Sequence, residues 1–160
     1  MSAAHPISAP IAIADLAARV GGASFTSRWF ALDQARIDAF AAATEDRQFI
    51  HVDPVAARLT PFGGTIAHGF LTLAVLSAMA DDAMPPVAGL ALSLNYGFER
   101  VRFVAPVKAG ARVRGAFALV EVARRSEREW LTRYDATVEI EGADKPALVA
   151  QWLTMLVEAR

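Results

Sequence analysis

The stretch that decides the fold is IAHGFLTLAVLSAMADDAM, residues 66–84. Residues 65–80 contain no Asp, Glu, Lys or Arg, and apolar side chains cover nearly every face of a helix drawn through them. A helix that is hydrophobic all round is buried, and this one is shorter than the roughly 20 residues needed to cross a bilayer. We therefore expect a helix that runs through the middle of the protein.

The second half of the chain has a different pattern, with long β-forming segments separated by turn signals. Four such segments are LALSLNYGFERVRFVAPV (90–107), ARVRGAFALVEV (111–122), EWLTRYDATVEI (129–140) and LVAQWLTMLVEA (148–159), and residues 24–32 are a fifth, shorter candidate. Short connections between successive strands favour antiparallel pairing. The sequence thus predicts an α+β fold in which a curved antiparallel sheet wraps around the central apolar helix.

The bulk composition limits the classes of function. A chain of 160 residues suits one domain, 1–160, with residues 1–23 as an N-terminal extension. The hydrophobic content of 54% is high for a soluble chain and predicts a homo-oligomer. A net charge of −1 argues against nucleic-acid and membrane partners, and the absence of cysteine excludes disulfides and thiolate sites. The first twenty residues lack the basic start of a secretory signal, so we expect a cytoplasmic protein.

The loop TEDRQFIHVDP, residues 44–54, contains the candidate chemistry. Asp33 is a good N-cap for a helix over 34–44, and Asp46 follows the end of that helix, where the macrodipole mildly disfavours a carboxylate. His51 lies close enough in sequence for both side chains to converge on one small molecule, such as a water. Acid/base catalysis and a polar surface loop both remain possible on this pattern alone.

Other polar residues near the loop have structural interpretations as well. Asp53 precedes Pro54, the arrangement of an N-cap followed by proline at the first helical position, so we interpret it as structural. A metal site formed by His51, Asp53 and His68 is poorly supported, because the sequence has no HExxH or comparable ligand spacing. We therefore predict no metal.

The apolar helix contains two further candidates, Gly69 at its start and Ser77 well inside it. Gly69 offers a backbone N–H that lacks an intrahelical partner and could stabilise an oxyanion, although a glycine there could equally serve close packing. Ser77 lacks the GxSxG context of a hydrolase nucleophile. A serine within a helix usually bonds back to a carbonyl, and if functional its hydroxyl would donate a hydrogen bond.

A local basic cluster follows in the first long strand segment and beyond it. Its members are Arg100, Arg102, Lys108, Arg112 and Arg114. Solvated strand faces and phosphate binding explain this cluster equally well. No Walker-type or GxGxxG loop indicates a nucleotide-binding fold.

Together, TEDRQFIHVDP, PFGGTIAHGFLTLAVLSAM and NYGFERVRF resemble the MaoC-like (R)-specific enoyl-CoA hydratases, and most closely their NodN-like branch. The resemblance covers residues from about 25 to 157. It implies the hotdog fold, in which a curved antiparallel sheet wraps around one long helix. It also implies reversible syn hydration of a trans-2-enoyl-CoA to an (R)-3-hydroxyacyl-CoA, in a homodimer without a metal or prosthetic group.

The resemblance also implies roles for individual residues. Asp46 and His51 become the dyad that activates water, the Gly69 N–H becomes the donor to the thioester oxygen, and Ser77 supports the dyad. The residues predicted to bind the substrate are Gln48, Phe49, Asn95, Tyr96, Arg100 and Arg102. The commoner family loop has Gly before the aspartate and Asn-Pro before the histidine, where this chain has Glu45, Gln48 and Phe49. Gln followed by an aromatic residue is similar to the NodN-like branch.

Two alternative functions use the same fold. An acyl-CoA thioesterase would also use a carboxylate base and would release free CoA thiol. A non-catalytic acyl-CoA or lipid-binding module would keep the basic cluster and the apolar helix but would have no need of the Asp46, His51 and Ser77 set.

Overall fold

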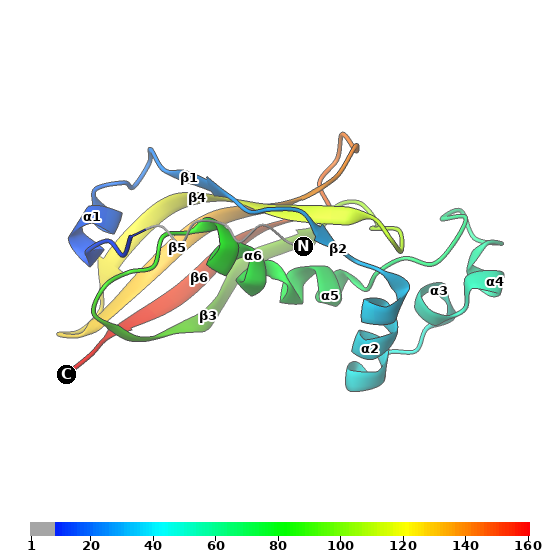
Figure 1. Cartoon of the computed structure of the whole chain (residues 1–160), viewed down its shortest axis with the longest axis horizontal. Coiled ribbons are helices and arrows are strands. Elements are labelled where there is room, and N and C mark those ends of the chain that lie inside the picture. The colour runs from blue at the N-terminus through cyan, green and yellow to red at the C-terminus, as the bar shows by residue number, and fades with distance from the viewer. Residues whose placement is uncertain (1–8) are drawn as a thin grey trace.

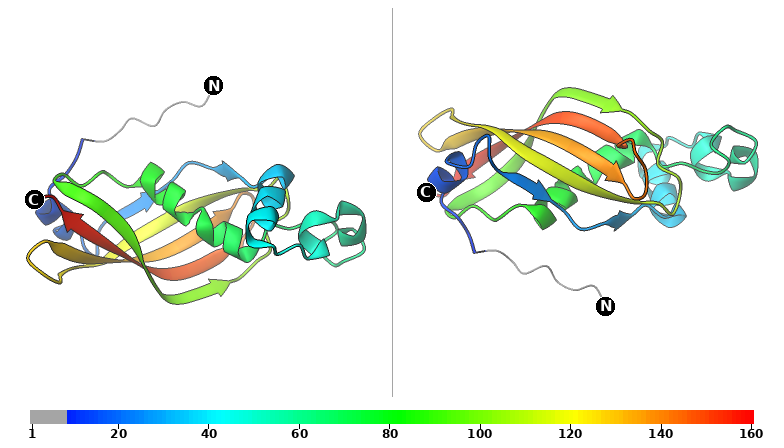
Figure 2. Two further views of the ribbon diagram at one scale, coloured as in Figure 1. Left: turned by 90° about the horizontal axis from the view of Figure 1, so that it is seen from below. Right: turned by 90° about the horizontal axis from the view of Figure 1, so that it is seen from above.

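The computed structural model describes residues 9–160, and its main feature is a six-stranded sheet curved around a helical segment (Figures 1 and 2). The strands follow the order β1-β4-β5-β6-β3, and β2 also pairs with β4. Each pair of these strands is antiparallel, which confirms the predicted sheet. The first eight residues of the predicted N-terminal extension lie outside the described residues.

The four long strands agree closely with the segments predicted from the sequence. They are β3 (Leu90–Phe103), β4 (Arg112–Arg124), β5 (Glu129–Ile140) and β6 (Leu148–Glu158). The segment 24–32 forms two short strands, β1 (Ser24–Thr26) and β2 (Phe30–Ala31), in place of one continuous strand. Strand β3 lies at an edge of the sheet and pairs only with β6 among the described strands.

The apolar helix lies across the concave face of the sheet as two segments, α5 (Gly69–Ala74) and α6 (Leu76–Ala83) (Figure 1). The break falls at Val75, whose φ of −76° and ψ of −3° depart from α-helical values. Burial on every face was predicted, and that prediction is wrong, because Phe70 is 67% exposed and Ala78 is also exposed. The sheet covers only one side of the helix, so its opposite side stays open.

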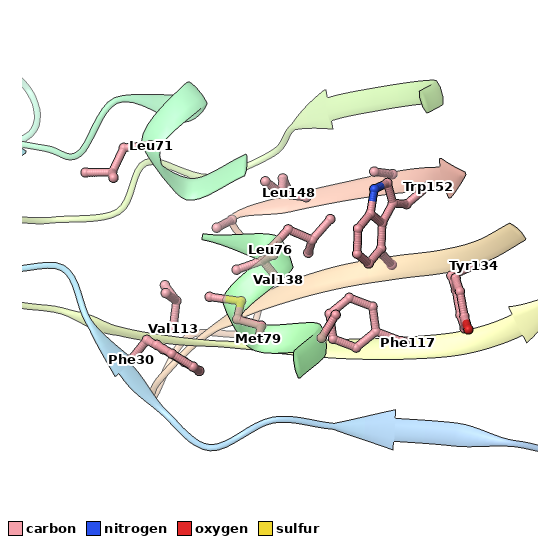
Figure 3. Packing of buried hydrophobic residues seen from close by; sticks show 14 of the residues in the cluster. Phe30, Leu71, Leu76, Met79, Val113, Phe117, Tyr134, Val138, Leu148 and Trp152 are labelled. Atoms are coloured by element: carbon pink, nitrogen blue, oxygen red, sulfur yellow. The ribbon is translucent and has the colours of Figure 1, made fainter. Parts of the chain in front are cut away.

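The core forms where the covered side of the helix meets the sheet (Figure 3). Leu76 and Met79 of α6 pack with side chains that alternate inward along the strands, including Phe117, Val138 and Leu148. These five side chains are nearly inaccessible to solvent. Burial of such side chains stabilises the fold by about 1.5–3 kcal/mol each and holds α6 in place over β4, β5 and β6.

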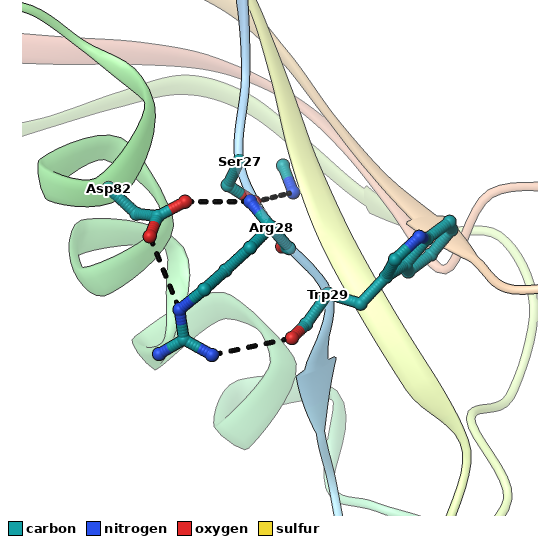
Figure 4. Close-up of polar contacts among 5 residues, drawn as sticks. Ser27, Arg28, Trp29 and Asp82 are labelled. Carbon is teal, nitrogen blue, oxygen red and sulfur yellow. Dashed lines mark hydrogen bonds and ion pairs between the residues drawn. The ribbon is translucent and has the colours of Figure 1, made fainter. Parts of the chain in front are cut away.

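Polar contacts attach the far end of α6 to the β1–β2 edge (Figure 4). The Arg28 backbone N–H donates to Asp82 Oδ2 at 2.6 Å, and Arg28 Nε lies 3.2 Å from Asp82 Oδ1. The Gly115 N–H of β4 donates to Ser27 Oγ at 3.0 Å. A short helix, α1 (Ile13–Ala17), adds the buried Leu16 to the core.

Three helices extend beyond the end of the sheet: α2 (Gln34–Thr44), α3 (Phe49–Val52) and α4 (Pro54–Ala57) (Figures 1 and 2). Both predicted N-caps are confirmed, since Asp33 accepts from the Arg36 N–H, and Asp53 accepts from the Val55 and Ala56 N–H groups. The loop between α2 and α3 lies next to the beginning of α5, where His68 contacts the Asp46 backbone. Across residues 9–160, no helix has the length and apolar character required to span a membrane.

Candidate active site

Three side chains meet between the end of α2 and the beginning of α5: Asp46, His51 and His68. One ligand-type atom from each lies within 4.8 Å of the others. Asp46 follows α2, His51 belongs to α3, and His68 is the N-cap residue of α5. The structure thus brings together the two residues of the predicted dyad and adds a second histidine to them.

His51 is buried, and its ring orientation is fixed by a backbone hydrogen bond. Its Nδ1 lies 2.7 Å from the Ile66 carbonyl oxygen. A carbonyl oxygen can only accept, so Nδ1 carries the proton and Nε2 of the neutral ring carries a lone pair. The carbonyl oxygen of His51 itself accepts from Gln34 Nε2 at 2.7 Å. His51 is therefore arranged to accept a hydrogen bond through Nε2.

His68 is more deeply buried, at 2% exposure, and contacts both members of the dyad. Its Nε2 lies 2.9 Å from the backbone oxygen of Asp46 and donates to it. Its ring stacks on that of His51, with centroids 3.7 Å apart and planes inclined by 25°. Its Nδ1 is buried and has no hydrogen-bond partner among the described residues. On another side, Phe40 packs against the ring at a centroid distance of 5.0 Å.

Asp46 has an exposed carboxylate in a loop that begins with a strained residue. Glu45 has φ 63° and ψ 7°, the left-handed conformation that costs a residue with a Cβ about 1–2 kcal/mol. This is the position at which the commoner family loop has glycine. Among the described residues, the Asp46 carboxylate accepts one hydrogen bond, a long one of 3.4 Å from the Gln48 N–H to Oδ1. Its oxygens are otherwise available to accept a proton from a small molecule.

Asp46, His51 and His68 lie close enough together to be ligands of one metal ion, but the two rings are not oriented for it. Zinc lies about 2.0–2.1 Å from each histidine nitrogen and in the plane of each ring. Two rings stacked 3.7 Å apart with nearly parallel planes cannot both direct a lone pair at one ion. Asp53, the third ligand of the metal site considered from the sequence, is occupied in capping α4.

Gly69 lies at the beginning of α5, beside Phe103. It is the first residue of α5, so its N–H has no intrahelical acceptor. A Cβ at this position would lie 3.0–3.1 Å from atoms of the Phe103 ring, closer than an ordinary contact. Gly69 therefore places a backbone N–H without an intrahelical acceptor next to His68 and leaves room for Phe103.

Ser77 lies further along the helix, in α6, and pairs with Asn95 of β3. Asn95 Nδ2 donates to Ser77 Oγ at 3.1 Å. Between residues 9 and 160, no hydrogen bond connects Ser77 to Asp46 or His51. The structure thus joins two predicted site residues to each other, at a distance along the helix from the dyad.

The other predicted substrate-binding residues are divided between the two faces of the molecule. Gln48 and the exposed Phe49 are at the beginning of α3, next to the dyad. Tyr96 is 58% exposed on the edge strand β3. Phe103 of β3 contacts Gly69, so its side chain lies on the helix side of the sheet. Arg100 and Arg102 lie at positions of β3 that point the opposite way, so they project from the outer face of the sheet.

A cavity of about 620 Å³ lies beside the end of α6 that is remote from the dyad. Apolar side chains form much of its wall, including Ala80, Met84 and Leu156. Three residues that the sequence reasoning missed also line it: Tyr134, Trp152 and Thr154. Burial raises the pKa of the Tyr134 phenol, so its hydroxyl is neutral. The sequence signal that could have identified these three residues is a side chain with a polar group at an inward position of β5 or β6.

Comparison with known proteins places this geometry in context. Residues 15–140 match the family described as MaoC like domain. The chain is 50% identical over 147 residues to Nodulation protein N of Rhizobium leguminosarum bv. viciae, covering 91% of each chain. It is 45% identical over 145 residues to 3-hydroxyacyl-thioester dehydratase Z of Mycobacterium tuberculosis, covering 91% of this chain and 95% of the other.

A solved structure agrees with the fold. The MaoC-like dehydratase from Rhodospirillum rubrum superimposes with a TM-score of 0.75 at 21% identity, covering 94% of this chain and 99% of the other. The predicted hotdog fold is confirmed by this likeness together with the curved antiparallel sheet.

Proposed function

The chain belongs to the MaoC-like dehydratase family, and from that premise we propose that it catalyses the reversible syn hydration of a trans-2-enoyl-CoA to an (R)-3-hydroxyacyl-CoA. The observation that carries the proposal is the cluster of Asp46, His51 and His68, in which the hydrogen bond to Ile66 leaves His51 Nε2 free to accept. The Gly69 N–H at the beginning of α5 supplies the second requirement, a donor for the thioester oxygen.

The proposed reaction adds one water across the double bond. His51 Nε2 accepts a hydrogen bond from the water and orients it, while the Asp46 carboxylate takes the other proton as the water oxygen bonds to C3. The π electrons move onto the thioester oxygen, where the Gly69 N–H stabilises the enolate. Asp46 then returns its proton to C2 on the face that received the hydroxyl, which gives syn addition. The reaction transfers no electrons to an acceptor, so it requires no redox cofactor.

The cavity beside α6 is the proposed site of the acyl chain. Ser77 and Asn95 lie between the dyad and the cavity along the helix, and Ala80 follows Ser77 by about one turn. The apolar wall suits a hydrocarbon chain that extends from the reacting carbons past Ser77 to the sheet side of α6, where Ala80 lines the cavity. The Ser77 and Asn95 side chains would then border the chain and contribute to holding the site open.

A homodimer is the proposed assembly. The free edge of β3 presents unpaired backbone groups, and exposed apolar side chains line this strand, including Leu92, Leu94 and Tyr96. A second copy that pairs with β3 would extend the sheet from one subunit to the other. Sedimentation equilibrium should give twice the chain mass of 17.1 kDa.

The test is to mix the purified protein with crotonyl-CoA, follow the loss of enoyl-thioester absorbance and assay free thiol in parallel. Loss of absorbance with formation of (R)-3-hydroxybutyryl-CoA and no thiol would support the proposal. Release of thiol would contradict it in favour of a thioesterase. If neither signal changes, the assay is repeated with longer enoyl-CoA chains, and continued absence of turnover would indicate a binding module.

A further inference from the structure

His68 contacts both members of the dyad but has the geometry of neither a proton donor to substrate nor a ligand. Its Nδ1 is buried and its Nε2 is bonded to a backbone oxygen, so neither ring nitrogen is presented to a substrate that enters from solvent. Its Nε2 donates to the Asp46 backbone oxygen, and its ring stacks on His51. We infer that His68 is a positioning residue that fixes the Asp46 peptide and the His51 ring relative to each other. This inference rests on the proposed function.

The hydrogen bond to Asp46 acts on a loop with few other attachments. Residues 42–49 are all exposed, Glu45 holds a strained left-handed conformation, and the Asp46 side chain accepts only the 3.4 Å bond from Gln48. The 2.9 Å bond from His68 Nε2 therefore anchors the peptide of Asp46 to a buried element, the beginning of α5. Without this anchor, the strained loop can relax and move the carboxylate away from His51.

The stacked ring acts on the second member of the dyad. His51 is held along one edge by Ile66 and on one face by His68, so rotation of its ring is limited from two directions. His68 Nε2 donates to a carbonyl, and Nδ1 is buried without a hydrogen-bond partner among residues 9–160. The His68 ring thus contacts His51 through its flat face.

Three substitutions separate the hydrogen bond from the stack. His68→Gln keeps an amide N–H at the same number of bonds from the backbone as Nε2, so it can still donate to Asp46, but it has no ring. His68→Phe keeps a ring against His51 and removes the donor. His68→Leu removes both. The control is Ser27→Ala, which leaves the Gly115 N–H unpaired in the sheet and lowers stability far from the loop.

The experiment measures kcat and KM with an enoyl-CoA that the wild type hydrates, and hydrogen–deuterium exchange in the peptide that contains residues 45–48. For His68→Phe we expect kcat to fall about 10²-fold with KM nearly unchanged, because a small misplacement of a catalytic group has that effect. Exchange in the loop should accelerate in His68→Phe and His68→Leu. His68→Gln should retain more activity than His68→Phe, and the amides of its 45–48 loop should exchange more slowly than those of His68→Phe. Ser27→Ala should lower the melting temperature without changing either readout per folded molecule.

Each result bears on the inference separately from the proposed function. The positioning role of His68 would be overturned if kcat and loop exchange were unchanged in His68→Phe. It would also be overturned if His68→Phe and His68→Gln lost kcat equally. A raised KM with unchanged kcat would also overturn it, because that pattern indicates lost substrate binding. If the wild type hydrates no enoyl thioester but the exchange pattern is as expected, the proposed function fails while the anchoring of Asp46 stands.

Discussion

The imidazole rings of His51 and His68 stack with their centroids 3.7 Å apart, although one belongs to α3 and the other caps α5. Each ring donates one proton to a backbone carbonyl, His51 to Ile66 and His68 to Asp46. These bonds leave His51 Nε2 as the ring nitrogen of the dyad that can contact a substrate water. The chemistry of the site follows from these two backbone hydrogen bonds.

The role of Asp46 as proton acceptor is tested by Asp46→Asn. The amide cannot take a proton from water, so we expect kcat to fall by about 10²- to 10⁴-fold. The melting temperature should hardly change, because the side chain is exposed and accepts only a 3.4 Å hydrogen bond. Asp53→Ala is a matched control, which should lose about 0.5–2 kcal/mol of stability through the α4 cap and keep its turnover. Loss of folding with activity retained per folded molecule in Asp46→Asn would count against the dyad.

The two nitrogens of His51 have separable roles. His51→Asn places an amide N–H near the position of Nδ1, where it can still donate to Ile66, but it has no counterpart of Nε2. We expect this variant to lose activity and keep its stability in urea unfolding. His51→Leu should lose activity and also about 1–3 kcal/mol, because the Ile66 carbonyl is left unpaired. An active His51→Asn would show that Nε2 does not contact the reacting water.

Gly69 can be tested for packing and for its N–H separately, because alanine retains the backbone donor. Gly69→Ala should reduce activity, since the new Cβ would lie 3.0–3.1 Å from the Phe103 ring and displace the beginning of α5. Phe103→Leu should relieve that contact, so the double variant should recover much of the lost kcat. The measurement is kcat for both single variants and the double variant. A double variant as inactive as Gly69→Ala would mean that glycine is needed for a reason other than Phe103.

The elements of the fold could be predicted because their signals are local. The β-forming segments that begin at 90 and 111, the turn signals between strands, and the caps at Asp33 and Asp53 depend only on neighbouring residues, and the structure contains the strands and caps. The open side of α5 and α6 was not predicted, because the apolar pattern of a helix does not reveal how far the sheet extends. The cytoplasmic location and the homodimer stay predictions.

The site was predictable in part. Asp46 and His51 were found from their spacing and from the family resemblance, and the structure brings them together. His68 was noted only as the beginning of the helix and as a weak metal candidate. Its contacts depend on the path of the chain between α3 and α5, which no local pattern encodes. The pairing of Ser77 with Asn95 depends in the same way on where β3 crosses α6.

The strain at Glu45 gives a prediction about stability. Glycine enters the left-handed region without the Cβ penalty, so Glu45→Gly should stabilise the protein by up to about 1 kcal/mol, after allowance for the greater freedom of glycine in the unfolded chain. Glu45→Ala keeps the Cβ and should give no such gain. Urea unfolding of both variants measures the difference. A Glu45→Gly variant no more stable than Glu45→Ala would contradict a left-handed conformation at this position.

The proposed path of the acyl chain predicts a change in substrate preference from one residue. Ala80 is buried on α6 and lines the cavity, so Ala80→Phe should fill space that a longer chain requires. We expect kcat/KM for a medium-chain enoyl-CoA to fall about tenfold or more, and kcat/KM for crotonyl-CoA to change little. Some stability, about 1–3 kcal/mol, is expected to be lost through overpacking. Ala78→Phe adds the same ring on the exposed side of α6 and should leave the ratio of the two kcat/KM values unchanged. An Ala80→Phe variant that loses activity equally on both substrates would show that the chain does not enter this cavity.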